Sequence, residues 1–457
     1  MDIYDLIVKN AKIVSPDSIT DGCVFVKDGK IAAVGESAEG AKAQKIVDAG
    51  GKYVLPGGVD VHVHFRDPGL TYKEDFSTGS MAAAAGGITT VFDMPNVQPP
   101  TLSVENFQIK KKIAEEKSYV NYGIYAYLVN NLDQIDGLID AGVCGFKWDL
   151  STFDWELPEG YYLPDNNEAA DIFRAIAKHD YVVTVHAEDM ELVKNYTEHL
   201  KEEGRDEKDF YSHVEARPDI VELSALYRTF VLSEVSGCRV HITHLTSKRG
   251  LELIKEFQRK GTPVTSDVGP AWFTFSAEDY EKFGGGIRVI PAIRYRKDSD
   301  ALWKGLASGD IEVLATDHAP HSNDEKFNRT WWDTLPGTIG VQTSLPILLD
   351  RVNKGEITIN RVVDCMAAQP SKIFGLYPRK GCIQPGADAD LTIVDMEKEW
   401  TVTHEEMYSK TKYTPYDGFQ LKGKPVMTIV MGSIVMEDGK IVGKPGHGRM
   451  VNPKQEW

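Results

Sequence analysis

The middle of the chain, from about residue 55 to 370, alternates short apolar segments with helical ones, and this alternation limits the possible folds most strongly. Clear helical segments are Asn167–Lys178, Ile220–Val235 and Lys248–Gln258. Eight strands separated by helices predict an α/β protein with a (β/α)8 TIM barrel. A doubly wound open sheet is the alternative, but no glycine-rich phosphate turn joins a strand to a helix. The expected strands are Gly58–Phe65, Thr89–Met94, Asn121–Tyr127, Gly142–Lys147, Val182–His186, Arg239–Thr243, Pro263–Ser266 and Val313–Thr316.

Both ends of the chain have the pattern of short strands joined by turns. The dipeptides Asp28-Gly29 and Asp438-Gly439 lie between alternating apolar segments and are strong signals for β-hairpins. Two β-rich ends around a different middle predict that residues 1–54 and 371–457 together form one small β-sandwich domain. The barrel would then occupy residues 55–370.

Composition excludes several classes of function. The 457 residues include 51 Lys and Arg against 68 Asp and Glu, a net charge of −17, with 42% hydrophobic and 26% charged residues. This is the usage of a soluble globular protein. The acidic balance argues against nucleic-acid and membrane partners, which require clustered Lys and Arg. With no signal-type start, no apolar run of about 18 residues and five scattered cysteines, we expect a reduced cytoplasmic protein.

Histidines at the ends of expected strands indicate a metal site. His62 and His64 are two residues apart in an extended segment, so both imidazoles project to the same face, as ligands of one ion must. His186 and Asp317 each follow a run of apolar strand residues. Of two histidines three residues apart, we favour the second, His244, because only one can take the strand-end position. Barrel enzymes collect ligands from several strand ends, so their wide separation in the sequence is no obstacle.

Lys147 ends another expected strand and allows two interpretations. A buried, unpaired ammonium is costly, so the side chain could extend to solvent or pair with Asp149. Alternatively, the amine is desolvated and deprotonated, adds CO₂ and becomes a carbamate. That anion could bridge two cations held by the nearby ligand candidates.

Several segments together resemble the amidohydrolase superfamily, in its cyclic amidohydrolase group of dihydroorotases, allantoinases, hydantoinases and dihydropyrimidinases. Asp60–Pro68 resembles the first signature of this group, and Ala315–His321 with Lys326 resembles the second. The resemblance runs from about residue 5 to 450. Further matching segments are Met94–Asn96, Gly145–Lys147, His186–Glu188, Ala216–Pro218 and Gly386–Leu391.

The resemblance implies a binuclear hydrolase that opens a small cyclic amide, in a homodimer or homotetramer. Zn²⁺ suits the donor set best, and Mn²⁺, Co²⁺, Ni²⁺ or Fe²⁺ are also compatible. A hydroxide bridging the two metals would be the nucleophile, and Asp317 would pass its proton to the departing nitrogen. By similarity, His62, His64 and Asp317 would hold one metal, His186 and His244 the other, and the CO₂-derived carbamate of Lys147 would bridge them.

The residues around the site also bear on the substituent of the ring. Arg66, Asn96 and His321 match the positions that hold the substrate carboxylate in dihydroorotases. Against that substrate, Gly269–Trp272 and Ile290 depart from the usual dihydroorotase pattern. The leading hypothesis is therefore a hydantoinase-like or allantoinase-like enzyme, with dihydroorotase as the alternative. An inactive scaffold of the same fold and a mononuclear deaminase, which would not need the lysine, are remote rivals.

Three further features are left open by the sequence. Asp149–Leu157, after the candidate carbamate, matches no loop of the group. Arg66 could instead form an ion pair with Asp67 or Glu74. The pair Trp331-Trp332 could line a pocket, although aromatic pairs in long loops more often serve packing.

Overall fold

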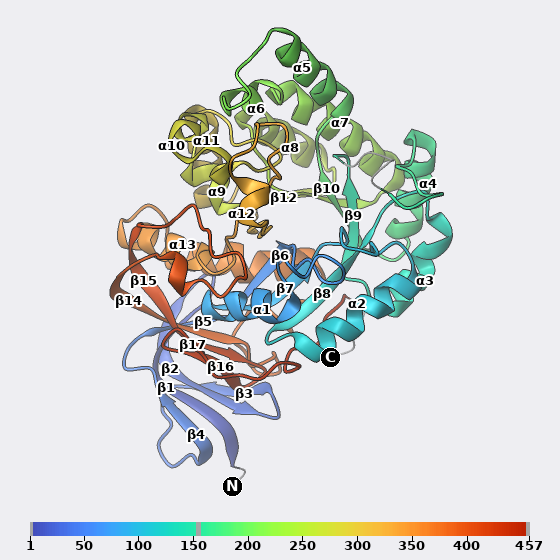
Figure 1. Cartoon of the computed structure of the whole chain (residues 1–457). Helices are drawn as coiled ribbons and strands as arrows, with labels where there is room; N and C mark the ends of the chain where they lie inside the picture. Colours follow the sequence, from blue (N-terminus) through green and yellow to red (C-terminus); the bar gives the residue numbers. More distant parts are fainter. Residues whose placement is uncertain (1–2, 152–156, 454–457) are drawn as a thin grey trace.

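The computed structural model describes residues 3–151 and 157–453. At its centre, eight parallel strands lie side by side in the order of the sequence, from β6 to β13 (Figure 1). A parallel bridge between Val63 and His318 joins the first strand to the segment after the last one. The predicted barrel is therefore confirmed. Its strands are β6 (Gly58–Val63), β7 (Ile88–Asp93), β8 (Asn121–Tyr127), β9 (Gly145–Asp149), β10 (Val182–His186), β11 (Arg239–Ile242), β12 (Val264–Val268) and β13 (Val313–Leu314).

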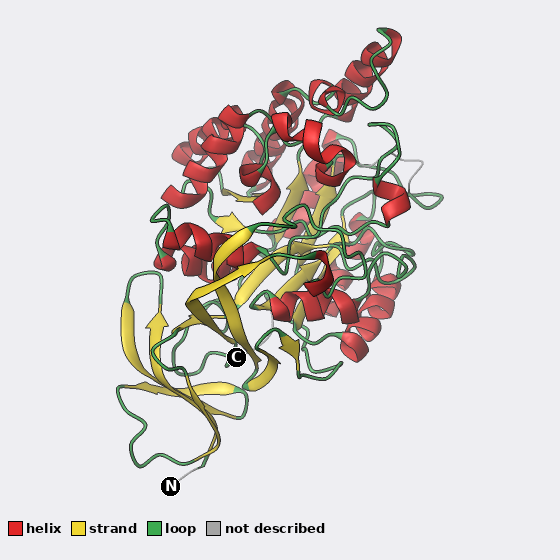
Figure 2. Cartoon of the chain, turned by 60° about the vertical axis from the view of Figure 1, so that its left-hand side comes forward, coloured by secondary structure: helices red, strands yellow, loops and turns green. Residues whose placement is uncertain are grey.

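Helices surround the barrel strands (Figure 2). The three expected helices form within two residues of their expected ends, as α4, α7 and α8. The helices are α1 (Phe76–Ala85), α2 (Val104–Lys117), α3 (Ile135–Ala141), α4 (Asn166–Ala177), α5 (Met190–Glu202), α6 (Tyr211–Glu215), α7 (Asp219–Ser236), α8 (Lys248–Lys260), α9 (Pro270–Thr274), α10 (Tyr280–Phe283), α11 (Arg296–Ser308), α12 (Asn323–Lys326), α13 (Ser344–Asn353), α14 (Ile359–Val363) and α15 (Gln369–Ile373).

The sequence of α8 shows how local chemistry sets such a helix. Leu251, Ile254 and Phe257 recur at helical spacing and are buried. The Ser247 side chain accepts a backbone N–H of the first turn, which satisfies one of the free donors there. Gly261 follows the last turn with φ 92°, a left-handed conformation that favours glycine and ends the helix.

Strand β9 differs from its expected extent, and the difference matters for the site. It begins at Gly145 rather than Gly142, because Gly142 has φ 102° and terminates α3. It continues to Asp149, so Lys147 lies inside the strand and not at its end. The side chain of Lys147 therefore starts deeper in the barrel than the sequence suggested.

Both termini build a second, mostly antiparallel sheet, at the lower left of Figure 1. The first half of β1 pairs with β4 and its second half with β5, so the nine strands form one branched sheet whose arms share an apolar cluster. This confirms that both ends of the chain together build a β-structure separate from the barrel. Its strands are β1 (Tyr4–Val14), β2 (Ile19–Lys27), β3 (Lys30–Gly35), β4 (Ala43–Asp48), β5 (Tyr53–Pro56), β14 (Leu391–Thr401), β15 (Gln420–Val430), β16 (Ser433–Glu437) and β17 (Lys440–Ile441).

The terminal sheet lies directly against the barrel. The hydroxyl of Thr392 donates to the carbonyl of Gly87 at 2.7 Å, and that of Thr428 donates to the carbonyl of Ala84 at 2.7 Å. Gly87 has φ 82°, and a Cβ there would lie 2.7 Å from the Thr392 methyl, so only glycine fits. Among the described residues, no helix has the length and apolar character needed to cross a membrane.

Candidate metal-binding active site

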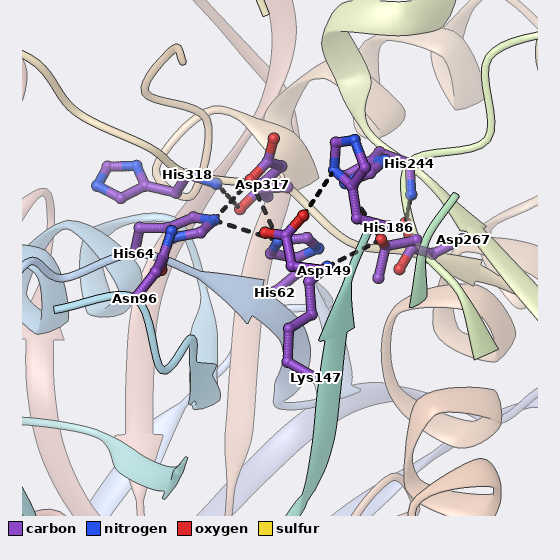
Figure 3. A network of polar contacts seen from close by, with 12 residues as sticks. His62, His64, Asn96, Lys147, Asp149, His186, His244, Asp267, Asp317 and His318 are labelled. Atoms are coloured by element: carbon purple, nitrogen blue, oxygen red, sulfur yellow. Dashed lines mark hydrogen bonds and ion pairs between the residues drawn. The ribbon is translucent and has the colours of Figure 1, made fainter. Parts of the chain in front are cut away.

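One cavity of about 200 Å³ lies where the barrel strands end. Its lining includes every residue that the sequence predicted for the site, although these come from or follow six different strands. Figure 3 shows most of them together above the strand ends. The nine residues are His62, His64, Arg66, Asn96, Lys147, His186, His244, Asp317 and His321.

Three potential ligand atoms meet on one side of this cavity. The Nε2 atoms of His62 and His64 lie 3.2 Å apart, and Asp317 Oδ1 is 3.2 Å from the first and 3.0 Å from the second. Asn96 Oδ1 lies 2.8 Å from Nδ1 of His64, which places the proton on Nδ1 and leaves Nε2 free to bind a cation. Burial lowers the pKa of both histidines, so they are neutral, as metal ligands must be.

His186 and His244 form a second pair beside the first group. Their ring centroids are 4.6 Å apart, and the His62 and His244 centroids are 5.3 Å apart, so the imidazoles form one continuous cluster. Nε2 of His186 lies 2.8 Å from a carboxylate oxygen of Glu188. The proton is therefore on Nε2, and the lone pair of Nδ1 is free to bind a cation. Nδ1 of His244 is buried and has no hydrogen-bond partner in the described part of the chain. A bound cation would satisfy this nitrogen, so the pair fits a metal position.

Lys147 is a buried amine without a carboxylate partner among the described residues. Its side chain is 3% exposed, and Nζ donates to Thr243 Oγ1 at 3.1 Å. Among residues 3–151 and 157–453 it forms no ion pair, so neither solvent exposure nor pairing with Asp149 describes it. Burial lowers its pKa, and this exceeds the opposite influence of nearby carboxylates. Such an amine is more often unprotonated than an ordinary lysine and can act as a nucleophile.

Three lining residues have left-handed backbone conformations, with φ 60° at Arg66, 37° at His244 and 47° at Asp317. Such conformations cost about 1–3 kcal/mol each and persist only where the surroundings enforce them. Buried aspartates hold all three turns by accepting backbone N–H groups. Asp93 accepts from Phe65 at 2.6 Å, Asp267 from His244 at 2.6 Å and Asp60 from Thr316 at 3.1 Å.

Arg66 gives the cavity a cationic wall, and the imidazole of His321 lies beside it. Nη2 of Arg66 lies 3.1 Å from Nε2 of His321, and its Nε donates to the carbonyl of Pro320 at 3.3 Å. In the described chain Arg66 makes no ion pair, because Asp67 instead pairs with Lys117 at 2.7 Å. Burial and the Arg66 charge lower the pKa of His321 to about 3, so this imidazole is neutral.

Asp149 also lines the cavity, a position that the sequence analysis did not assign to the site. Its Oδ1 lies 3.9 Å from Nδ1 of His186 and accepts a hydrogen bond from Ser151 Oγ at 2.6 Å. A neighbouring cavity of about 530 Å³ shares Asn96, Asp149, Ser151 and Ile290 with the first and provides room beside it. Of the unmatched loop that follows, residues 152–156 lie outside the described residues.

A parallel barrel with clustered histidines and an aspartate at its strand ends is the architecture of a metal-dependent hydrolase. The model of the Amidohydrolase family matches residues 53–435, and the chain belongs to that family. The L-hydantoinase of Paenarthrobacter aurescens is 36% identical over 455 residues, which cover 98% of each chain. A solved structure of L-hydantoinase (dihydropyrimidinase) from Arthrobacter aurescens superposes with a TM-score of 0.95 at 36% identity, covering 98% of this chain and 100% of that one.

Relatives with other names are nearly as similar. The dihydroorotase of Methanothermobacter thermautotrophicus is 34% identical over 449 residues, covering 98% of this chain and 97% of that one. The allantoinase of Rubrobacter xylanophilus is 33% identical over 470 residues, covering 100% and 99%. Since the three identities differ so little, overall similarity does not select a substrate, and the cavity itself must.

Proposed function

We propose that the protein is a binuclear metal-dependent cyclic amidohydrolase that opens the ring amide bond of a cyclic ureide, as a hydantoinase or allantoinase does. One observation carries this proposal. The ligand atoms of His62, His64 and Asp317 converge within 3.2 Å of one another in a cavity that His186 and His244 also line. Membership of the family and similarity to the L-hydantoinase support it.

Each ligand has a proposed role. Two divalent cations, with Zn²⁺ the first choice and Mn²⁺, Co²⁺, Ni²⁺ or Fe²⁺ compatible, would polarise the ring carbonyl and acidify a water molecule. His62, His64 and Asp317 would hold one cation, and His186 and His244 the other. The Asp317 carboxylate would also accept the proton of the attacking water and deliver it to the departing amide nitrogen.

We assign the bridging ligand to Lys147 after reaction with CO₂. The unprotonated amine attacks the carbon of CO₂ and releases a proton, which leaves a carbamate anion on Nζ. The burial of Lys147, its lowered pKa and its lack of an ion pair in the described chain support this assignment. A carbamate between two cations would replace an unfavourable buried amine by a neutralised anion.

Dihydroorotase is the second candidate, and the cationic wall favours it. Arg66 is buried and its guanidinium meets no carboxylate within ion-pair distance in the described chain, while His321 contacts it directly. A substrate carboxylate would supply the missing counter-charge. Asn96 is already bonded to His64 through Oδ1, so it would have only its amide N–H groups to offer.

A substrate panel separates the two candidates. Hydantoins, allantoin, dihydrouracil and dihydroorotate should be assayed with the wild type and with Arg66→Met. If dihydroorotate is the best substrate, the variant should lose about a hundredfold in kcat/KM on it, because a charged hydrogen bond is removed. If an uncharged hydantoin is best, the loss should stay below about threefold. Arg259→Met, an exposed arginine at the end of α8, serves as the control.

We also propose that the chain divides into two domains at residues 54/55 and 370/371, points that fall inside strand β5 and helix α15. We further propose that the enzyme is a cytoplasmic homodimer or homotetramer. Assembly is supported by α7, where Ile220, Tyr227, Val231 and Val235 recur on one face and are 42–58% exposed. Val231→Glu should therefore reduce the particle mass measured by light scattering, and an unchanged mass would exclude this face as an interface.

A further inference from the structure

A second cavity, with none of the first cavity's lining residues, has a different chemistry. It encloses about 270 Å³ between α5, the segment that follows α6, and two loops of the later barrel. Four cationic side chains line it, Lys194, Lys201, Arg217 and Arg288, against one carboxylate, Glu198. In a chain with a net charge of −17, this is a local reversal of sign.

Two residues of this lining each have a buried hydrogen-bond donor that has no partner in the described part of the chain. Arg288 is 6% exposed, and its Nε donates to the carbonyl of Trp331 at 2.7 Å, but its Nη1 has no partner among the described residues. The indole Nε1 of Trp331, which is 2% exposed, also has none there. Both groups can only donate, so the partner that each lacks must be an acceptor.

The two guanidinium groups are neutralised to different extents. Arg217 pairs with Glu188 at 2.7 Å, whereas Arg288 forms no ion pair in the described part of the chain. Burial, and next the Arg217 charge, lower the pKa of Arg288 to about 9. After burial, the same two arginines also lower the pKa of His213, another lining residue. The cavity therefore has a positive potential that a bound anion would neutralise.

Much of the remaining lining is apolar. The rings of Trp331 and Trp332 meet edge to face with centroids 5.1 Å apart, and Val193 and Met190 lie in the same lining. Lys201 Nζ is 4.5 Å from the Trp332 ring centroid. Aromatic surface next to cationic donors suits a ligand that has an apolar part and an anionic head. It does not suit a bare metal cation.

We propose that this cavity binds a small organic carboxylate, whose anionic group lies at Arg288 and the Trp331 N–H and whose apolar part lies against the indole rings. The tryptophan pair then lines a binding site, one of the two roles that the sequence left open for it. The proposal requires nothing of the metal site, so the two can be tested separately.

Benzoate is a suitable probe, titrated by calorimetry into the metal-loaded, full-length enzyme. We expect saturable binding to one site per chain, and no binding of benzamide, which has the same ring without the charge. Arg288→Met should weaken benzoate binding at least tenfold, and Trp331→Phe, which removes the N–H but keeps an aromatic ring, about threefold to tenfold. Arg259→Met should leave it unchanged.

Three results would overturn the proposal. One is equal binding of benzamide, and another is binding of inorganic phosphate as tight as that of benzoate, because it would remove the role of the apolar walls. The third is binding that survives Arg288→Met but is lost in Arg66→Met, which would locate the benzoate in the first cavity. If Arg288→Met does not fold, as judged by its thermal unfolding, Trp331→Phe still decides. An enzyme inactive on every cyclic amide would refute the proposed function without altering these results.

Discussion

The two halves of the candidate metal site are built to different degrees. His62, His64 and Asp317 bring three ligand atoms within 3.2 Å of one another through the fold alone. His186 and His244 lie beside them. The anion that would complete this second half is the carbamate proposed for Lys147, which forms only after reaction with CO₂. Lys147 instead donates a hydrogen bond to a threonine hydroxyl. We infer that folding completes the first half, whereas the second needs a chemical step after folding.

The largest expected effect comes from the residue that would serve both metal binding and proton transfer. Asp317→Asn keeps the shape of the side chain but removes its charge and its basicity. We expect kcat to fall by about 10²- to 10⁴-fold, the usual contribution of general acid–base catalysis, when it is assayed with excess metal. The matched control is Asp310→Asn, a half-buried aspartate outside the cavity that pairs with Lys255. Activity within tenfold of the wild type would contradict the assigned role.

Lys147→Met tests whether the second half depends on the lysine. We expect elemental analysis of the purified variant to show about one metal ion per chain in place of about two, with activity reduced at least a hundredfold. The thermal unfolding midpoint of the metal-free protein should stay the same or rise, because a buried amine without an ion pair is replaced by an apolar side chain of similar length.

Lys178→Met, on the exposed end of α4, controls for the loss of a lysine elsewhere. If the Lys147 variant retains two ions and full activity, the carbamate is not required and the two halves do not differ as we infer. One ion in the wild type would instead favour a mononuclear enzyme.

The sequence predicted the histidine and aspartate ligand candidates that line the cavity because their signals are local. Arg66, Asn96 and His321 followed only from the family resemblance, and Asp149 was missed. The spacing of His62 and His64 places both side chains on the same face of an extended segment. The carboxyl ends of all strands of a parallel barrel lie at the same end of the barrel. The extent of β9 was wrong because the left-handed turn at Gly142 belongs to the preceding helix. The error in the ends of the strand is only two or three residues, but it changes the depth of Lys147 in the barrel.

Residues that act through other residues were missed. Asp60, Asp93 and Asp267 are carboxylates in buried strands, and this was the available signal. Their partners, however, lie on other strands or in loops far along the chain. His241, which the sequence analysis set aside, bonds to Asp267 at 3.0 Å and does not line the cavity. Long-range pairs of this kind depend on how the strands close into a barrel, which local spacing does not reveal.

The smallest expected effect concerns Glu188, which orients His186. Its Oε2 lies 2.8 Å from His186 Nε2 and 2.7 Å from Arg217 Nη1. Burial raises the pKa of Glu188, but the opposite effect of Arg217 and His186 is larger. The net pKa is about 2, so the carboxylate is charged. Glu188→Gln keeps the shape and removes the charge. We expect metal affinity at the second half to fall about 10- to 100-fold, as for other partners of metal-binding histidines.

Asn96→Ala provides the mirror experiment, because Asn96 contacts His64 in the first half. Chelator competition should then show weakened binding of one metal in each variant, and of a different metal in the two. Excess metal should restore most of the activity of Glu188→Gln, since a weakened site can still be filled by mass action. If both variants weaken the same ion, or if each weakens both ions equally, the two halves bind as a single unit. The difference between the two halves that we infer from the unmodified lysine would then not extend to the protein with bound metal.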